Sequence, residues 1–264
     1  MREKYRKNTI RFLVIFLSVL MLIVIMIFSI ACSGFEDVKS YLSYAVKENL
    51  EMKTGSTGLD NGKIDYNMEG KEIMLPQPKL ESESSLEEAL AKRRSIRSFS
   101  SKELSLDELS QLLWAAQGIT KEDTGYRTSP SAGALYPLEL FLLKSDGVYH
   151  YVPDGHKMLK ISSEDLRLPL VQGVVFQGFV SEAPVNIIIT AIYERTTAKY
   201  GNRGVRYVHI EVGHCCQNIL LQATALGLGA VPVGAFDDSY IQKLLNLPSE
   251  YQPLYVIPVG YPKD

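Results

Sequence analysis

Three short segments carry residue types that could bind a phosphorylated ligand with a flat ring. The first is Arg93-Arg94-Ser95-Ile96-Arg97, which places three guanidinium groups and a hydroxyl in one run. Guanidinium groups pair bidentately with phosphate oxygens, so this segment could surround a phosphate. A solvated basic helix end would produce the same pattern, and the segment alone does not decide between the two.

The second and third segments are rich in small residues. The segment from Thr128 to Pro137 reads TSPSAGALYP, and the segment from Gly227 to Gly234 reads GLGAVPVG. Small side chains and proline let a ligand approach the backbone closely and leave amides accessible at a helix start. A plain turn explains the second segment equally well, and a helix end that leads into a strand explains the third.

The chain's composition excludes several classes of protein. The 264 residues are 46% hydrophobic and 22% charged, with 28 Lys+Arg against 30 Asp+Glu and a formal net charge of -2. A sizeable core is therefore available, and collagen-like, wholly disordered and disulfide-framework classes are excluded. Outside the first eleven residues there is no basic block that could follow a phosphate backbone, so no nucleic acid partner is expected.

The potential metal ligands are not spaced as a metal site. His209 and His214 are five positions apart, which does not give the i,i+4 pair of a helical zinc site. Cys215 and Cys216 are adjacent and rarely satisfy disulfide geometry, so we interpret them as packing residues. We expect no metal.

Residues 1–34 predict a membrane anchor or a signal segment. The stretch from Phe12 to Ala31 has no charged residue, and at about 1.5 Å per residue it can span a bilayer as a transmembrane helix. The basic residues before it predict a cytoplasmic N-terminus and a membrane-anchored, extracytoplasmic domain. The run from Ile30 to Gly34 also resembles the end of a lipoprotein signal, in which Cys32 would be lipidated. An uncleaved anchor and a lipidated Cys32 both remain open.

The rest of the chain divides into a tether and one domain. Residues 35–79 mix Ser, Gly, Lys and Glu and predict a tether, whereas residues 80–264 carry dense apolar patterning. The patterns predict helices at 85–92, 105–117, 203–226 and 238–245, and strands at 139–144, 148–151, 185–191, 230–233 and 254–259. Because helices and strands alternate without regular βαβ spacing, the fold class favoured is an α+β sheet covered by helices.

Together these segments resemble the nitroreductase superfamily, and the resemblance extends from Leu86 to Lys263. It rests on the Arg-Arg-Ser-Ile-Arg start and on the Pro-Ser-Ala-Gly-Ala-Leu-Tyr-Pro-Leu-Glu block. It also rests on the segment from Lys199 to Tyr207, the Glu-Val-Gly-His helix with Gln217-Asn218, and the closing Pro-Val-Gly-Tyr-Pro. The branch that these motifs match best is the SagB/ThcOx-type branch, the azoline dehydrogenases.

The resemblance implies an FMN-binding flavoprotein with a nitroreductase-like central sheet flanked by helices, and a homodimer with flavins at the subunit interface. Carried over by motif, Arg93, Arg94 and Ser95 would hold the FMN phosphate, and Arg97 would lie near the N1/C2-carbonyl edge of the ring. Other implied flavin contacts are Pro130, Ser131 and Ala132 from the partner subunit, Gln177 at the pyrimidine edge, and Pro232, Val233 and Gly234 along the ring.

Two further roles follow from the same resemblance. Lys199 and Tyr200 match the Lys-Tyr pair that removes a proton in the azoline dehydrogenases, so we expect them to be catalytic. Lys263 is the candidate for the basic residue that many nitroreductases place against the FMN phosphate from a C-terminal arm. The azoline dehydrogenases act on ribosomal peptides with cytosolic partners, whereas the predicted anchor places this domain outside.

The function expected is that of a membrane-tethered FMN-dependent oxidoreductase that exchanges hydride at flavin N5 with a small-molecule or peptide substrate. One alternative is a nitro or quinone reductase that takes its electrons from NAD(P)H. Another is a non-catalytic binding module that keeps the flavin fold. The presence of Lys199-Tyr200 favours the dehydrogenase.

Overall fold

The computed structural model describes residues 71–175 and 177–263. The predicted anchor, Cys32 and most of the predicted tether lie outside these residues. Within the part of the chain that the structure describes, no helix is both long and apolar enough to cross a membrane.

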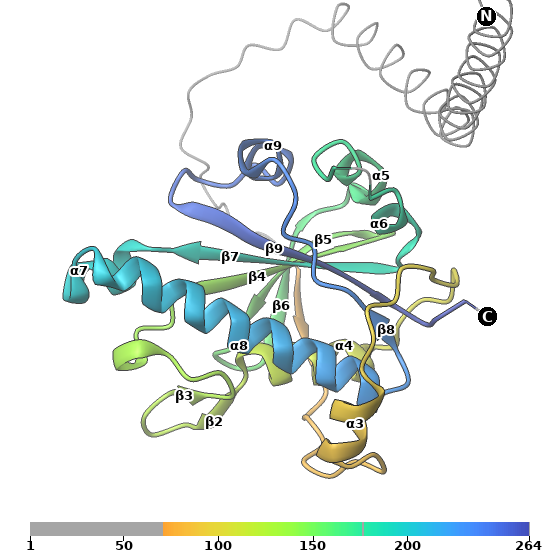
Figure 1. Cartoon of the computed structure of the whole chain (residues 1–264), viewed down its shortest axis with the longest axis horizontal. Coiled ribbons are helices and arrows are strands. Elements are labelled where there is room, and N and C mark those ends of the chain that lie inside the picture. The colour runs from red at the N-terminus through yellow and green to blue at the C-terminus, as the bar shows by residue number, and fades with distance from the viewer. Residues whose placement is uncertain (1–70, 176, 264) are drawn as a thin grey trace, which may run out of the picture. The chain divides into compact units, whose positions relative to one another are not determined.

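A seven-stranded sheet forms the centre of the described domain (Figure 1), in the order β1-β6-β5-β4-β7-β9-β8. Every neighbouring pair of strands is antiparallel. The strands are β1 (Glu72–Met74), β4 (Leu138–Lys144), β5 (Gly147–Val152), β6 (Lys157–Ser162), β7 (Val185–Ile192), β8 (Gly229–Ala230) and β9 (Tyr251–Gly260). A separate two-stranded sheet pairs β2 (Ile119–Lys121) with β3 (Tyr126–Arg127).

Helices cover both faces of this sheet. In Figure 1, α3, α4 and α8 lie on one face, and α5, α6 and α9 lie on the other. The helices are α3 (Leu86–Lys92), α4 (Leu106–Gln117), α5 (Arg167–Leu170), α6 (Phe179–Glu182), α7 (Glu194–Tyr200), α8 (Arg203–Ala225) and α9 (Asp238–Leu244), with a 3-10 turn η1 (Ala132–Ala134). The predicted α+β class, a central sheet flanked by helices, is confirmed.

The alternation of side chains along the central strands explains why each face of the sheet carries its own hydrophobic cluster. On β4, Leu140 and Leu142 join the cluster under α4 and α8, whereas Phe141 and Leu143 join the cluster under α5 and α9. Successive side chains of a strand point to opposite faces, so a strand that is buried on both faces must be apolar at nearly every position. The predicted strand at 185–191 shows the same continuous burial and becomes β7.

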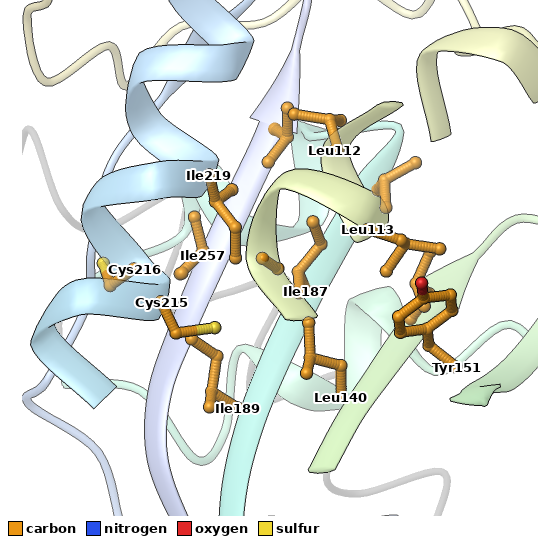
Figure 2. Packing of buried hydrophobic residues seen from close by; sticks show 14 of the residues in the cluster. Leu112, Leu113, Leu140, Tyr151, Ile187, Ile189, Cys215, Cys216, Ile219 and Ile257 are labelled. Atoms are coloured by element: carbon orange, nitrogen blue, oxygen red, sulfur yellow. The ribbon is translucent and has the colours of Figure 1, made fainter. Parts of the chain in front are cut away.

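Helix α8 is the long element of the first core. Figure 2 shows Cys215 and Ile219 of α8 and Leu112 of α4 packed with Ile187 and Ile257 of the sheet. Both Cys215 and Cys216 are free and buried. Burial raises the pKa of the Cys216 thiol to about 12, so it stays protonated and packs as a small apolar group.

A capping box begins α4. Ser105 accepts a hydrogen bond from the Glu108 amide, and the Glu108 carboxylate accepts one from the Ser105 amide at 2.7 Å. Each side chain satisfies a backbone donor that the first helical turn leaves free.

Three features differ from the sequence-based expectation. The predicted strand 230–233 is wrong in extent, because β8 is only Gly229–Ala230 and Pro232 has no amide to continue a ladder. Strand β9 is longer than the predicted 254–259. Strands β1 and β6 escaped prediction because they are short and carry charged residues, and β1 extends the sheet into the range assigned to the tether.

Candidate functional site

The predicted site residues form two groups at the two ends of α8. We call the first the arginine group: Arg93, Arg94, Ser95, Arg97, Gln177, Pro232, Val233, Gly234 and Lys263. We call the second the lysine–tyrosine group: Pro130, Ser131, Ala132, Lys199 and Tyr200. Helix α8 has 23 residues and is therefore roughly 35 Å long. In Figure 1 it runs from α7, which carries Lys199 and Tyr200, to the side where α3 and β8 lie.

The 93–97 segment is held against the strand that follows α8. Ser95 forms a parallel bridge with Ala230, and the Ile96 amide donates to the Ala230 carbonyl at 3.1 Å. A Cβ built on Gly229 would lie 2.7 Å from the Ile96 side chain, so only glycine allows this approach. The basic segment and the small-residue segment, far apart in the sequence, therefore meet in the fold.

The guanidinium groups of this segment form no ion pair with a carboxylate of the described residues. Arg94 and Arg97 are exposed. Arg94 Nη1 donates to the carbonyls of Ala91 and Arg93, and the Arg97 guanidinium lies 6.0 Å from the centroid of the Phe179 ring. Within residues 71–175 and 177–263, neither these two nor Arg93 forms an ion pair with a carboxylate. Their positive charge is available to an external anion such as a phosphate.

The backbone beside this charge is open. Val233 is fixed to β9 by a hydrogen bond from its amide to the Val256 carbonyl at 2.8 Å, whereas Gly234 is exposed. Gln177 Nε2 donates to the Ala235 carbonyl at 3.4 Å, which places the amide side chain beside Gly234. A flat ring could therefore lie along this strip without meeting a side chain at Gly234.

The C-terminal segment joins the same group. The Lys263 amide donates to the Ser98 carbonyl at 3.1 Å, and Pro262 bridges to Phe99. Lys263 is exposed, and its backbone lies beside Ser98, the residue that follows the 93–97 segment.

The lysine–tyrosine group forms at the other end of α8. A Cβ built on Gly133 would lie 2.8 Å from Tyr200 Oη and 3.1 Å from Lys199 Nζ. The Lys199 ammonium lies 5.4 Å from the centroid of the Tyr200 ring, and that ring meets Tyr207 edge to face at 5.1 Å. The fold thus brings the predicted catalytic pair onto the loop that contains Pro130, Ser131 and Ala132.

Sequence reasoning missed the residues that join α7 to this loop. Arg195 Nη1 donates to the Tyr136 carbonyl at 3.1 Å and lies 2.6 Å from Glu139 Oε1. His150 lies 2.7 Å from the other oxygen of the same carboxylate. Burial raises the pKa of Glu139, but the contacts with His150 and Arg195 outweigh it and hold that pKa below its usual value. The ionised Glu139 carboxylate therefore holds α7 in place through its ion pair with Arg195.

A second missed residue is Glu211. It lies between Val208 and Cys215 on the buried face of α8, and only 2% of it is exposed. The sequence does contain a signal for this residue, because Glu211 is an acid within the apolar stripe of a helix. A buried carboxyl is costly, so such a position points to a specific role.

Two further observations on the described part of the chain show where a ligand could or could not bind outside the two groups. No three His, Cys, Asp or Glu side chains there could jointly hold a metal ion. A groove of ≈ 670 Å³ lies between the 77–83 segment, α4 and α8, and none of the predicted site residues lines it.

Comparison with known proteins gives close relatives for this fold and these motifs. A protein of Methanocaldococcus jannaschii that carries a provisional nitroreductase name, MJ1384, is 48% identical over 195 residues, which cover 72% of this chain and 96% of that protein. The microcin B17-processing protein McbC of Escherichia coli is 29% identical over 157 residues, which cover 54% of this chain and 57% of McbC.

A solved structure shares the architecture. The crystal structure of a Ralstonia eutropha protein with a provisional nitroreductase name superposes with a TM-score of 0.68 at 27% identity, covering 79% of this chain and 97% of that one. The sequence model of the nitroreductase family matches residues 90–261, a range that holds every predicted site residue except Lys263. The protein therefore belongs to the nitroreductase family.

Proposed function

We propose that this protein is a membrane-tethered, FMN-dependent oxidoreductase that works as a homodimer. Its family is one of oxidoreductases that generally bind FMN, which supports the cofactor. The observation that carries the proposal is the arginine group. Its guanidinium groups form no ion pair with any described residue, and they lie beside an exposed strip of backbone that contains Gly234.

The residues of the arginine group fit FMN by their chemistry. Arg93, Arg94 and Ser95 would hold the phosphate, and Arg97 would face the ring edge where negative charge develops. The strip from Pro232 to Gly234 would pack on the ring and exclude water from it. Bound FMN would supply the hydride chemistry at its N5 atom.

The separation of the two groups supports a homodimer. One copy cannot place both groups around one flavin, because most of the length of α8 lies between them. A second copy related by a two-fold axis would bring its lysine–tyrosine group to the arginine group of the first copy, and the reverse. The dimer would then hold two equivalent sites.

Lys199 and Tyr200 support a dehydrogenase acting on an organic substrate. Lys199 is exposed and, among the described residues, has no ion-pair partner, so a substrate could reach its amino group. In its deprotonated form that group would take the substrate proton while the Tyr200 hydroxyl orients the substrate. The similarity to McbC supports a peptide among the candidate substrates. The nitroreductase names of the other relatives support the alternative, a nitro or quinone reductase fed by NAD(P)H.

The first experiment is the visible absorbance spectrum of the full chain, purified in detergent, before and after anaerobic addition of NADH or NADPH. A bound flavin that stays oxidised would support the substrate dehydrogenase, and a flavin bleached by the nicotinamide would support the reductase. Absence of flavin, even after incubation with FMN, would contradict both and leave the non-catalytic binding module.

The role of Lys199 is tested by Lys199→Ala, with the exposed Lys121→Ala as its control. Loss of a positioned proton acceptor should lower turnover of the organic substrate about 100-fold or more while the flavin stays bound. Unchanged turnover would remove the support for a dehydrogenase.

The tether is a separate part of the proposal, and it rests on the sequence of residues 1–34. We propose that the domain lies on the outer side of the membrane. Protease added to intact cells should then degrade residues 80–264, and protection of these residues would contradict the placement.

A further inference from the structure

The end of helix α4 is joined to two side chains from elsewhere in the chain. The last carbonyls of an α-helix have no hydrogen-bond donor within the helix itself. In α4, the Ala115 carbonyl accepts a hydrogen bond from Asn218 Nδ2 of α8 at 3.0 Å. The Ala116 carbonyl accepts one from Ser129 Oγ at 2.7 Å. Side chains from α8 and from the loop after β3 therefore satisfy carbonyls that α4 leaves free.

The same two side chains also bond to each other. Asn218 Nδ2 donates to Ser129 Oγ at 3.2 Å. A carbonyl can only accept, so the amide nitrogen of Asn218 must face Ala115, and its second proton serves Ser129. The Ser129 hydroxyl then gives its one proton to the Ala116 carbonyl. The hydrogen bonds from α8 through Ser129 to α4 thus form a single chain in which every donor and acceptor is fixed.

This chain of hydrogen bonds is sheltered from water. Ser129 and Ala116 are fully buried, and Asn218 is half-buried. If the Ser129 hydroxyl were removed, the Ala116 carbonyl would lose its donor at a place that water does not reach. A buried acceptor without a partner costs more than an exposed one, so the bond between Ser129 and α4 should be strong.

The loop that leaves Ser129 has little else to fix it. Pro130, Gly133 and Ala134 are exposed, so core packing does not hold them. The rest of the turn depends on Ser131, whose carbonyl accepts from the Ala134 amide at 3.1 Å. Its hydroxyl accepts from the Tyr136 amide at 2.9 Å. We call residues 131–136 the 131–136 turn, and Ser129 lies two residues before it.

Thr128 attaches the start of the loop to the same helix end. Its Oγ1 donates to the Trp114 carbonyl at 3.0 Å, and its amide donates to the Gly118 carbonyl at 2.9 Å. These two bonds come from α4 and the residue that follows it. Asn218 therefore adds the hydrogen-bond contact from α8, the helix whose first residues follow the Lys199-Tyr200 pair.

We propose that Ser129 and Asn218 are positioning residues that fix the loop carrying Pro130, Ser131 and Ala132 by joining it to α4 and α8. In the proposed dimer this loop contacts the flavin of the partner subunit. Asn218 in one copy would then set flavin contacts in the other copy. That consequence rests on the proposed function, whereas the attachment of the loop does not.

Hydrogen exchange of two amides tests the attachment. The amides of Ala134 and Tyr136 both bond to Ser131, so their protection reports whether the loop is in place. It is measured on the full chain in detergent, stripped of flavin. Ser129→Ala should lower the protection of both amides about 5-fold to 30-fold, because a buried carbonyl loses its donor.

Ser110→Ala is the matched control. Ser110 is a buried serine of the same helix, and its hydroxyl also donates to a backbone carbonyl, that of Pro76. This variant should lower the free energy of unfolding by a similar amount, but it should leave the Ala134 and Tyr136 amides protected, because the Ser110 bond stays intact when only the loop opens. Equal loss of protection in the two variants, or no loss in Ser129→Ala, would overturn the proposal.

A second pair of variants tests the contact from α8. Asn218→Ala keeps the bond between Ser129 and Ala116, so it should lower protection less than Ser129→Ala does. The exposed neighbour Gln217→Ala should match the wild type. Because the two side chains act in one chain, the double variant should lose less protection than the two single losses combined. Losses that simply multiply would overturn the proposed chain, and if Ser129→Ala does not fold, Asn218→Ala against Gln217→Ala decides.

The affinity for FMN separates this proposal from the proposed function. Fluorescence quenching of FMN should give a dissociation constant at least about fivefold higher for Ser129→Ala than for Ser110→Ala, because the released loop no longer offers its contacts. If the loop amides lose protection while the affinity is unchanged, the flavin placement is contradicted and the positioning role stands. If the affinity falls while the loop amides stay protected, the positioning role is overturned.

Discussion

Gly133 and Tyr200 meet so closely that a single methyl group on Gly133 would lie 2.8 Å from the Tyr200 hydroxyl. Gly133 also has a φ of 67°, a region that L side chains rarely adopt. The glycine therefore serves two purposes, a left-handed turn and space for the Lys199-Tyr200 pair.

The first prediction separates these purposes. Gly133→Ala should destabilise the protein by about 1 to 2 kcal/mol through its backbone and should also displace the ends of Lys199 and Tyr200. Gly125→Ala is a matched control, because Gly125 has a φ of 66° and open space around its Cβ position. Denaturant unfolding should show similar losses in both variants, whereas only Gly133→Ala should lower turnover. Equal turnover in the two variants would contradict the role of the contact.

The chemistry-bearing segments were recognisable from the sequence because each is continuous. Arg93 to Arg97 and Thr128 to Pro137 keep their residue types together whatever the fold. The resemblance implied that Pro130, Ser131 and Ala132 come from the partner subunit. It did not imply that Lys199 and Tyr200 lie with their loop, at the end of α8 away from the arginine group, because that placement depends on the folded chain. Lys263 joins the arginine group through a backbone contact with Ser98, which no local pattern encodes.

The core elements were predictable for a similar reason. Helix α8 and strand β7 carry long, regular apolar patterns, so period and length identify them. Strand β1 lies at the edge of the sheet with β6 next to it, and their pairing joins segments far apart in the chain, which a short local pattern does not encode. The supporting residue Arg195 was invisible because its partners Tyr136 and Glu139 come from a distant segment.

The second prediction concerns Arg195 as the link between α7 and the 131–136 turn. Arg195→Lys keeps the charge but loses the rigid guanidinium whose Nη1 contacts both the Tyr136 carbonyl and the Glu139 carboxylate. Because Arg195 is partly exposed, the loss of unfolding free energy should be small, about 0.5 to 1 kcal/mol. Turnover should fall more than this small loss of stability alone would cause, because α7 carries Lys199.

A remote pair provides the control for that variant. Arg167→Lys alters an ion pair with Asp165 at 2.7 Å, far along the chain from α7. It should cost a similar free energy of unfolding and leave turnover unchanged. Turnover that falls equally in Arg167→Lys and Arg195→Lys would show that stability, and not the link, governs activity.

The third prediction concerns the phosphate end of the proposed flavin site. Arg94→Ala removes an exposed guanidinium that forms no ion pair among the described residues, so the fold should lose little stability. A charged hydrogen bond contributes about 1.5 to 3 kcal/mol, so the FMN dissociation constant should rise about 10-fold to 100-fold. Fluorescence quenching of FMN measures it, and Lys121→Ala should match the wild type. Unchanged affinity in Arg94→Ala would place the phosphate elsewhere.

A half-buried histidine gives the last prediction. His156 lies between Ser110 Oγ at 2.7 Å from Nε2 and the Tyr151 hydroxyl at 2.9 Å from Nδ1. Ser110 Oγ donates to the Pro76 carbonyl, so it accepts a hydrogen bond from Nε2–H, and Nδ1 accepts one from Tyr151. Both ring nitrogens are thus satisfied in the neutral imidazole.

The consequence is a loss of stability on acidification. Desolvation lowers the pKa of His156 below its usual 6.5, so the unfolded chain binds the proton more tightly than the folded one. The stabilisation is complete above about pH 6.5 and should decline below it, by at most about 1.4 kcal/mol per pH unit. His156→Asn tolerates the positive φ of this position and should abolish that decline, whereas the exposed His214→Asn should keep it. Urea unfolding at pH 5.5 and 7 measures the difference, and parallel pH profiles for wild type and His156→Asn would show that another group causes the acid sensitivity.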